Sequence, residues 1–93
     1  MNQLDFKGRH AVVTGGATGL GYAIAQRLIA SGGTVTLWDR DDAAGQRAAQ
    51  TLGAQTHAVA VDVAQHASVQ AAVQATLKHS PRIDALVNSA GIT

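Results

Sequence analysis

A glycine-rich segment between two apolar stretches constrains this chain more than any other feature of its sequence. Residues 14–21 read TGGATGLG, follow the short apolar run at 10–13 and precede an amphipathic run. Glycines tolerate positive φ and carry no Cβ, so the backbone can approach a ligand closely. The helix that follows points unpaired N–H groups and the positive end of its dipole at an anion. Strand, glycine turn and helix start, in this order, predict a dinucleotide pyrophosphate site.

The composition limits the chain to one small globular domain. Its 93 residues are expected to bury roughly 60–65% of the unfolded surface, which leaves a thin margin of stability. The net charge is +1 and the basic residues are scattered, without the basic stripe of a nucleic-acid binder. No apolar run approaches the roughly 20 residues of a membrane span, and residues 4–9 interrupt any secretory signal. We therefore expect neither nucleic acid nor a membrane as partner.

Two further residue types exclude other kinds of site. The chain has no cysteine, which excludes disulfides and thiol chemistry and favours a cytoplasmic protein. Its four histidines, at 10, 57, 66 and 79, lack metal-ligand spacing, so no metal site is expected.

Strand and helix patterns alternate along the whole chain. We expect strands at about 11–13, 34–39, 57–61 and 85–88, and helices at about 20–30, 42–52 and 65–79. Gly32 and Gly33 end the first helix, and Asp41 and Gly53 are expected to cap the second. Such an alternation with short connections predicts a parallel sheet.

The fold class that follows is α/β, a Rossmann-type three-layer α/β/α arrangement. With the strand order 3-2-1-4, the first two helices cover one face and the third helix covers the other. The last strand is then an exposed edge, whose apolar Leu86 and Val87 need neighbours. We therefore expect residues 1–93 to be the N-terminal part of one larger domain, marginally folded or oligomeric by themselves.

The glycine motif is T-G-x-x-x-G-x-G, and three further marks follow it in order. These are Asp39, the pair Asp62-Val63, and Asn88-Ser89-Ala90-Gly91. Together they resemble the short-chain dehydrogenase/reductase family over essentially the whole chain, in its N-terminal, cofactor-binding half. The resemblance implies an NAD(P) cofactor. The residues expected at the cofactor are Gly15, Thr18, Gly19, Leu20, Gly21, Asp39, Arg40, Asp62, Val63, Asn88, Ala90 and Gly91.

Asp39 decides which cofactor is favoured. It closes the second strand, eighteen residues after Gly21, where a carboxylate accepts bonds from both adenosine ribose hydroxyls and repels a 2′-phosphate. NAD is therefore favoured. NADP stays possible because the guanidinium of Arg40 can bind a 2′-phosphate if Asp39 turns away. Thr18 stands where many NADP-using relatives carry a basic residue. The alternative for Asp39 is a carboxylate that caps the second helix or lies solvated in the loop.

The remaining motifs, after the third and fourth predicted strands, have an assignment at the cofactor, an alternative structural role, or both. The resemblance places Asp62 and Val63 at the adenine edge, whereas a strand-end aspartate also commonly caps the following helix. Ala90 and Gly91 are implied beside the nicotinamide ribose. Asn88 either contacts the cofactor or ties strands together, and Ser89 departs from the family's usual Asn-Asn-Ala-Gly.

Catalysis is not expected within these residues. The family's proton relay implies a tyrosine with a lysine four residues later, but Gln26 follows the single tyrosine, Tyr22, at that spacing. The resemblance implies an oxidoreductase that moves hydride between nicotinamide and a secondary alcohol or ketone, of the oxoacyl or polyol kind. This chain would supply the cofactor site, in an assembly expected to be a homo-oligomer. The alternative is a non-catalytic nucleotide-binding fragment or interaction module.

Overall fold

The computed structural model describes residues 6–53 and 55–89, and strands and helices alternate strictly within them. The elements are β1 (His10–Thr14), α1 (Gly19–Ala30), β2 (Thr34–Asp39), α2 (Asp42–Leu52), β3 (Thr56–Ala60), α3 (His66–His79) and β4 (Ala85–Asn88). The strands form one parallel sheet in the order β3-β2-β1-β4. The predicted α/β class and strand order are confirmed.

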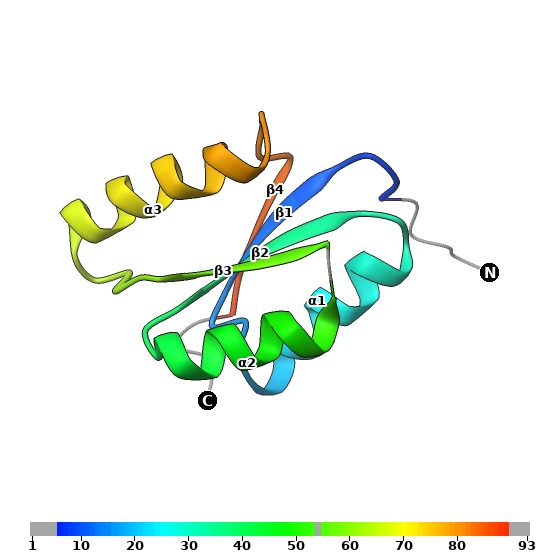
Figure 1. Cartoon of the computed structure of the whole chain (residues 1–93). Coiled ribbons are helices and arrows are strands. Elements are labelled where there is room, and N and C mark those ends of the chain that lie inside the picture. Colours follow the sequence, from blue (N-terminus) through cyan, green and yellow to red (C-terminus); the bar gives the residue numbers. More distant parts are fainter. Residues whose placement is uncertain (1–5, 54, 90–93) are drawn as a thin grey trace.

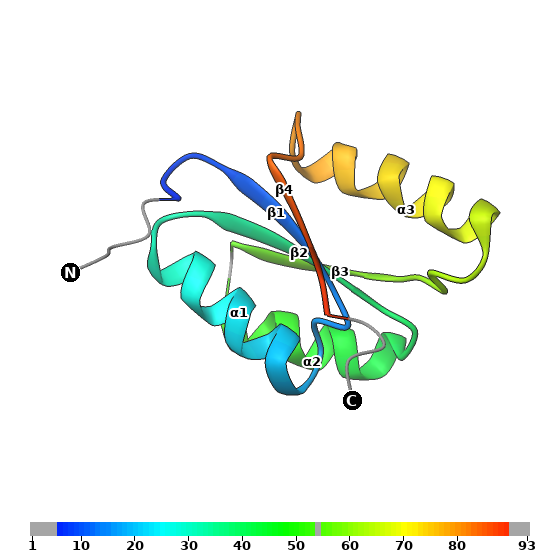
Figure 2. The same ribbon diagram turned by 180° about the vertical axis from the view of Figure 1, so that it is seen from behind.

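The helices lie on the two faces of the sheet as expected from right-handed crossovers. Figure 1 shows α1 and α2 together beneath the strands and α3 alone above them. The view from behind in Figure 2 shows the same three layers.

Strand β1 is the centre of the core. All five of its residues are buried. Because side chains alternate along a strand, Ala11 and Val13 face α1 and α2, while Val12 faces α3. Leu37 on β2 extends the first cluster and Trp38 extends the second. Two hydrophobic layers are thus built from one short alternating sequence.

Several element boundaries differ from the expected ones by a residue. β1 gains His10 and Thr14 because both pair with β2. β3 is shifted back by one residue, since Thr56 pairs with Val35 while Val61 follows the last pair. α1 begins one residue earlier, at Gly19, and α3 begins one residue later, after Gln65 at its N-cap.

The predicted ends of α1 and α2 are confirmed. The Asp41 side chain accepts a hydrogen bond from the Ala44 N–H (3.1 Å), and Gly53 stands at the C-cap with φ of 104°. Gly32 follows α1 with φ of 93°, a conformation that favours glycine.

Strand β4 forms one edge of the described sheet. Ala85 and Val87 pack against the core on the α1 and α2 side, whereas Leu86 on the opposite side is 63% exposed. Leu86 is uncovered as expected, whereas the expectation that Val87 also needs a neighbour is wrong, because Val87 packs against the core. No helix in the described part of the chain is long and apolar enough to cross a membrane.

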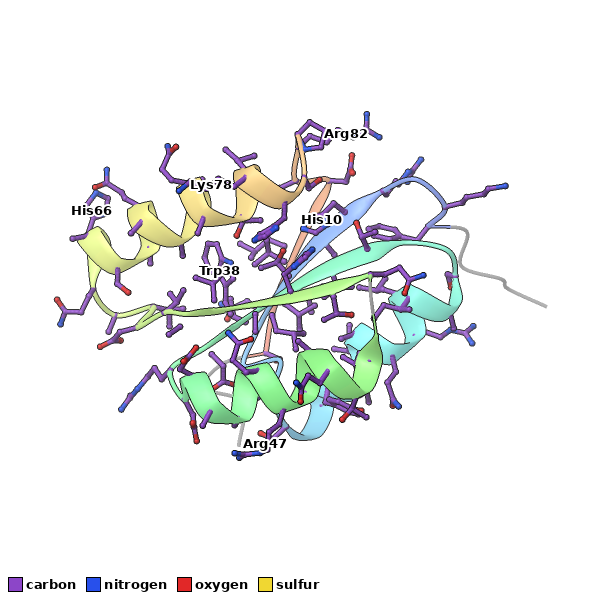
Figure 3. The ribbon with its side chains drawn as sticks, viewed as in Figure 1. His10, Trp38, Arg47, His66, Lys78 and Arg82 are labelled. Atoms are coloured by element: carbon purple, nitrogen blue, oxygen red, sulfur yellow. The ribbon has the colours of Figure 1, made fainter. Side chains whose placement is uncertain are left out.

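A polar network lies between the sheet and α3. The two ring nitrogens of His10 are 2.6 Å from Thr34 Oγ1 and 2.8 Å from Thr36 Oγ1. Trp38 Nε1 donates to Thr76 Oγ1 on α3 at 3.0 Å. Figure 3 shows His10 and Trp38 on the same face of the sheet, beneath α3. These bonds satisfy polar groups that a purely apolar layer would leave unpaired.

Two further imidazoles stack at the end of this layer. The ring centroids of His57, on β3, and His79, in the last turn of α3, lie 3.8 Å apart with the planes 13° from parallel. Burial lowers the pKa of His57, and the neighbouring charge of His79 lowers it further. Burial also lowers the pKa of His10; the histidines add to this, while Asp84 acts in the opposite direction.

Thr56 provides a test of how buried hydroxyls contribute to stability. Its Oγ1 is buried without a hydrogen-bond partner within residues 6–53 and 55–89. The isosteric Thr56→Val removes an unpaired polar atom, so we expect the free energy of unfolding to rise by about 1 kcal/mol. Urea denaturation measures it. The matched control is Thr36→Val, which breaks the bond to His10 and is expected to lower stability by a similar amount. Equal effects of the two changes would contradict this account.

The histidines predict a pH dependence of stability. Protonation of His10 and His57 is disfavoured in the folded chain, so the unfolded chain binds more protons as the pH falls below their ordinary pKa of 6.5. The free energy of unfolding is therefore expected to decrease from about pH 7 to about pH 5. Denaturant titrations at each pH measure it. His57→Gln should flatten the profile; an equally steep profile in His57→Gln would refute the assignment.

Candidate functional site

The candidate site lies where three parallel strands end. β1, β2 and β4 run in the same direction and are adjacent, so their carboxyl ends meet at one edge of the sheet. Thr14 pairs with Trp38 on one side and with Asn88 on the other. In open α/β sheets, ligands bind in the crevice outside these strand ends, where the strand order reverses around the first strand.

The loop between β1 and α1 has the conformation that glycines permit. Gly15 and Gly19 have φ of 65° and 58°, so a side chain at either position would be strained. Gly16 lies against Leu37, where an added Cβ would be 2.7 Å from the leucine Cδ2. The loop is thereby folded tightly over the end of the sheet.

The first turn of α1 keeps its amides available. The first helical bond runs from the Tyr22 N–H to the Thr18 carbonyl (3.4 Å), so the N–H groups of Gly19, Leu20 and Gly21 precede the helical ladder. Thr18 makes no side-chain cap bond, and the first turn holds no acidic residue. The contrast is α2, whose N-terminus is capped by an aspartate and has another in its first turn. Only α1 of these two presents an uncompensated positive end.

Close packing explains the third glycine of the motif. A Cβ at Gly21 would collide with the Gly15 carbonyl oxygen and would lie 2.6 Å from Ser89 Oγ. The helix start, the loop and the end of β4 therefore meet at one point without room for a methyl group.

The end of β4 is tied to the end of β1 by side chains. Thr14 Oγ1 donates to Asn88 Oδ1 at 2.8 Å, and Ser89 Oγ donates to the Thr14 carbonyl. Asn88 thus has the strand-tying contact that was one of its two expected roles. Ser89 is buried, and its hydroxyl holds the loop entrance. Ala90 and Gly91 lie outside the described residues.

Asp39 contacts the glycine loop directly. Its Oδ2 accepts the Ala17 N–H at 3.1 Å, and its Oδ1 accepts the Asp41 N–H at 3.0 Å. The alternative in which Asp39 caps α2 is wrong, because Asp41 holds that position. Arg40 is exposed beside it.

Asp62 and Val63 follow β3 at the same edge of the sheet. The Asp62 N–H donates to Ser68 Oγ, and Asp62 Oδ1 accepts the Ala64 N–H, both at 3.0 Å. The carboxylate therefore closes a turn before α3 and does not cap the helix, whose N-cap is Gln65. Val63 is 45% exposed, and its side chain is open to a ligand.

Sequence reasoning missed two contacts in this region. The Ala17 amide carries the bond to Asp39, yet an alanine gives no side-chain signal of such a role. Ser68, in the first turn of α3, accepts a hydrogen bond from the backbone of Asp62. The sequence signal that could have indicated this contact is the hydroxyl six residues after Asp62. Among the described residues, no group of three or more histidine, cysteine, aspartate or glutamate side chains could hold a metal ion.

An uncapped helix after a glycine turn, with a carboxylate at the end of the neighbouring strand, defines the class of dinucleotide-binding Rossmann domains. The short chain dehydrogenase family model matches residues 9–93, and the chain belongs to that family.

Named relatives agree with this membership. The chain is 47% identical over 88 residues to 2-dehydro-3-deoxy-L-rhamnonate dehydrogenase (NAD(+)) of a Sphingomonas species, covering 95% of this chain and 35% of the relative. It is 44% identical over 87 residues to the 3-oxoacyl-(acyl-carrier-protein) reductase FabG of Chlamydia trachomatis, covering 89% and 35%. The chain thus spans about a third of the length of these relatives.

Solved structures show the same fold. The 3-ketoacyl-(acyl-carrier-protein) reductase of Brucella melitensis, complexed with NADH, superposes with a TM-score of 0.85 at 37% identity, over 87% of this chain and 33% of that one. Pseudomonas aeruginosa RhlG, in an active-site complex with NADP, gives 0.87 at 38% identity, over 94% and 36%. Both nicotinamide cofactors therefore occur among proteins of this fold and similarity.

Proposed function

We propose that this chain is the cofactor-binding part of an NAD(P)-dependent oxidoreductase, and that it binds the dinucleotide at the carboxyl edge of its sheet. The observation that carries the proposal is the uncapped N-terminus of α1 behind a loop whose glycines adopt positive φ. Such a helix end attracts a diphosphate through free N–H groups and through its dipole.

The cofactor would extend across the ends of the strands. The amides near Gly15, Thr18, Gly19, Leu20 and Gly21 would hold the pyrophosphate. Further along, Asp62 and Val63 would meet adenine, while Asn88, Ala90 and Gly91 would border the nicotinamide ribose. When bound, the cofactor supplies hydride chemistry; the residues of this chain bind and orient it.

NAD is the cofactor we propose in preference to NADP. A carboxylate offers about four lone-pair sites, and the amides of Ala17 and Asp41 use one on each oxygen of Asp39. One site per oxygen remains for the two ribose hydroxyls. A 2′-phosphate would instead meet this negative charge. Arg40, exposed next to it, keeps NADP open as the second cofactor.

The reaction we propose for the whole protein is hydride transfer between nicotinamide and a secondary alcohol or ketone, with a 3-oxoacyl or polyol-like substrate. Relatives named for a sugar-acid dehydrogenase and an oxoacyl reductase support this range. We further propose that residues 1–93 carry no catalytic group, because no lysine follows Tyr22 at the required spacing. A cytoplasmic location and a homo-oligomer remain predictions.

Binding without turnover is the first expected result for this chain. Calorimetry should detect NAD binding, because the loop and helix start that would hold pyrophosphate are formed within residues 6–53. NADH consumption with a panel of ketones should be undetectable. Absence of NAD binding would overturn the cofactor assignment, whereas turnover would overturn the proposal that catalysis lies elsewhere.

The preference between cofactors is expected to depend on Asp39. In Asp39→Ala the two ribose bonds and the repulsion of a 2′-phosphate are both lost, so the ratio of NAD to NADP affinity should fall by about tenfold or more. Titration of each cofactor against the wild-type and variant proteins measures the ratio. Asp42→Ala, which removes a nearby exposed carboxylate from α2, is the matched control. An unchanged ratio in Asp39→Ala would exclude Asp39 as the selector.

A further inference from the structure

Few hydrogen bonds hold the glycine loop in place. Gly15 at its entrance donates its N–H to the Trp38 carbonyl at 2.7 Å. Beyond that point, the Ala17 N–H donates to Asp39 Oδ2 on the neighbouring strand at 3.1 Å. For the amides of Gly16 and Thr18 the structure records no partner within residues 6–53 and 55–89. Among the described residues, Asp39 is therefore the side chain of β2 that holds the middle of the loop by a hydrogen bond, while Leu37 packs against Gly16.

The bond between the Ala17 N–H and Asp39 lies between two flexible glycines, so it restricts the conformation of the loop. Gly15 and Gly19, on either side of Ala17, both have positive φ and lack a Cβ that would restrict the backbone. Without a tie between them, the loop has to be ordered when a ligand binds, and that ordering reduces affinity. A bond from an amide to a charged carboxylate is roughly twice as strong as one to a neutral acceptor.

We propose that Asp39 is a positioning residue for the pyrophosphate loop: by accepting the Ala17 N–H, its carboxylate holds the neighbouring amides in the arrangement that receives the diphosphate. This rests on the proposed function, since it concerns the same cofactor site. It goes beyond cofactor selection, because the loop serves NAD and NADP alike. Both oxygens of Asp39 keep a free lone pair, so positioning and ribose recognition operate together.

A positioning role and a purely ribose-selecting role of Asp39 predict opposite effects of Asp39→Ala on the affinity for pyrophosphate. Inorganic pyrophosphate has no ribose, so an Asp39 that acts only as ribose selector contributes nothing but repulsion to its binding. Asp39→Ala would then strengthen pyrophosphate binding. If Asp39 positions the loop, the same change weakens it, by an expected five- to tenfold, about the effect of one lost hydrogen bond.

The experiment is calorimetric titration of inorganic pyrophosphate into wild-type, Asp39→Ala and Asp42→Ala proteins. Asp42→Ala controls for the removal of one negative charge near the carboxyl edge, and it should bind at least as tightly as wild type. Asp39→Asn keeps the shape and one carbonyl acceptor, and is expected to bind more tightly than Asp39→Ala. Unchanged or tighter binding in Asp39→Ala overturns the proposal.

A second measurement on the wild-type protein does not depend on the folding of any variant. Amide hydrogen exchange, corrected for intrinsic rates, should be about tenfold or more slower at Ala17 than at Gly16 and Thr18, because a bonded amide must open before it exchanges. Equal rates at the three amides overturn the proposal. Absence of NAD and pyrophosphate binding in the wild type would instead reject the proposed function, while slow Ala17 exchange would still stand.

Discussion

The structure depends on the parallel pairing of one buried strand with a neighbour on each side. β1 is buried at every residue, and it joins β2 to β4 across the centre of the sheet. Because all three strands run in the same direction, their last residues arrive at the same edge. Thr14, Asp39 and Asn88 are far apart in sequence, yet this pairing brings them around a single loop. The candidate site is a direct consequence of strand order.

The same edge shows how one helix N-terminus is kept available while another is closed. α2 begins with an aspartate whose side chain accepts an amide of its own first turn. α1 begins after Thr18, whose side chain makes no cap bond, and its first amides are left to another partner. Around it, the loop is fixed from outside by Trp38 and Asp39 on β2 and by Ser89 after β4. Neighbouring strands thus position the site, and α1 supplies its charge.

The opposite face of the sheet serves stability in a different way. Under α3, apolar packing is joined by the bonds of His10 to Thr34 and Thr36, and of Trp38 to Thr76. The His57 and His79 rings attach the last turn of this helix to the edge strand β3. Beyond β1 on this face, Leu86 is largely exposed on β4. Coverage of the two faces is therefore unequal within the described residues.

The sequence by itself determined the element order and the identity of the glycine loop, while the strand order 3-2-1-4 was expected from the doubly wound pattern. Alternating apolar residues and glycines act through local backbone geometry and side-chain period, so elements and turns can be predicted from them without knowing which segments they pack against. The resemblance also indicated Asp39 as a cofactor residue. Only the tertiary structure decided that Asp39 reaches the Ala17 amide, that Ser89 donates to Thr14, and that Asp62 closes a turn instead of capping α3. The first two contacts depend on the distance between separate strands, which no local pattern of residues encodes, and the third on a choice between two local arrangements, a turn and a helix cap, that the sequence left open.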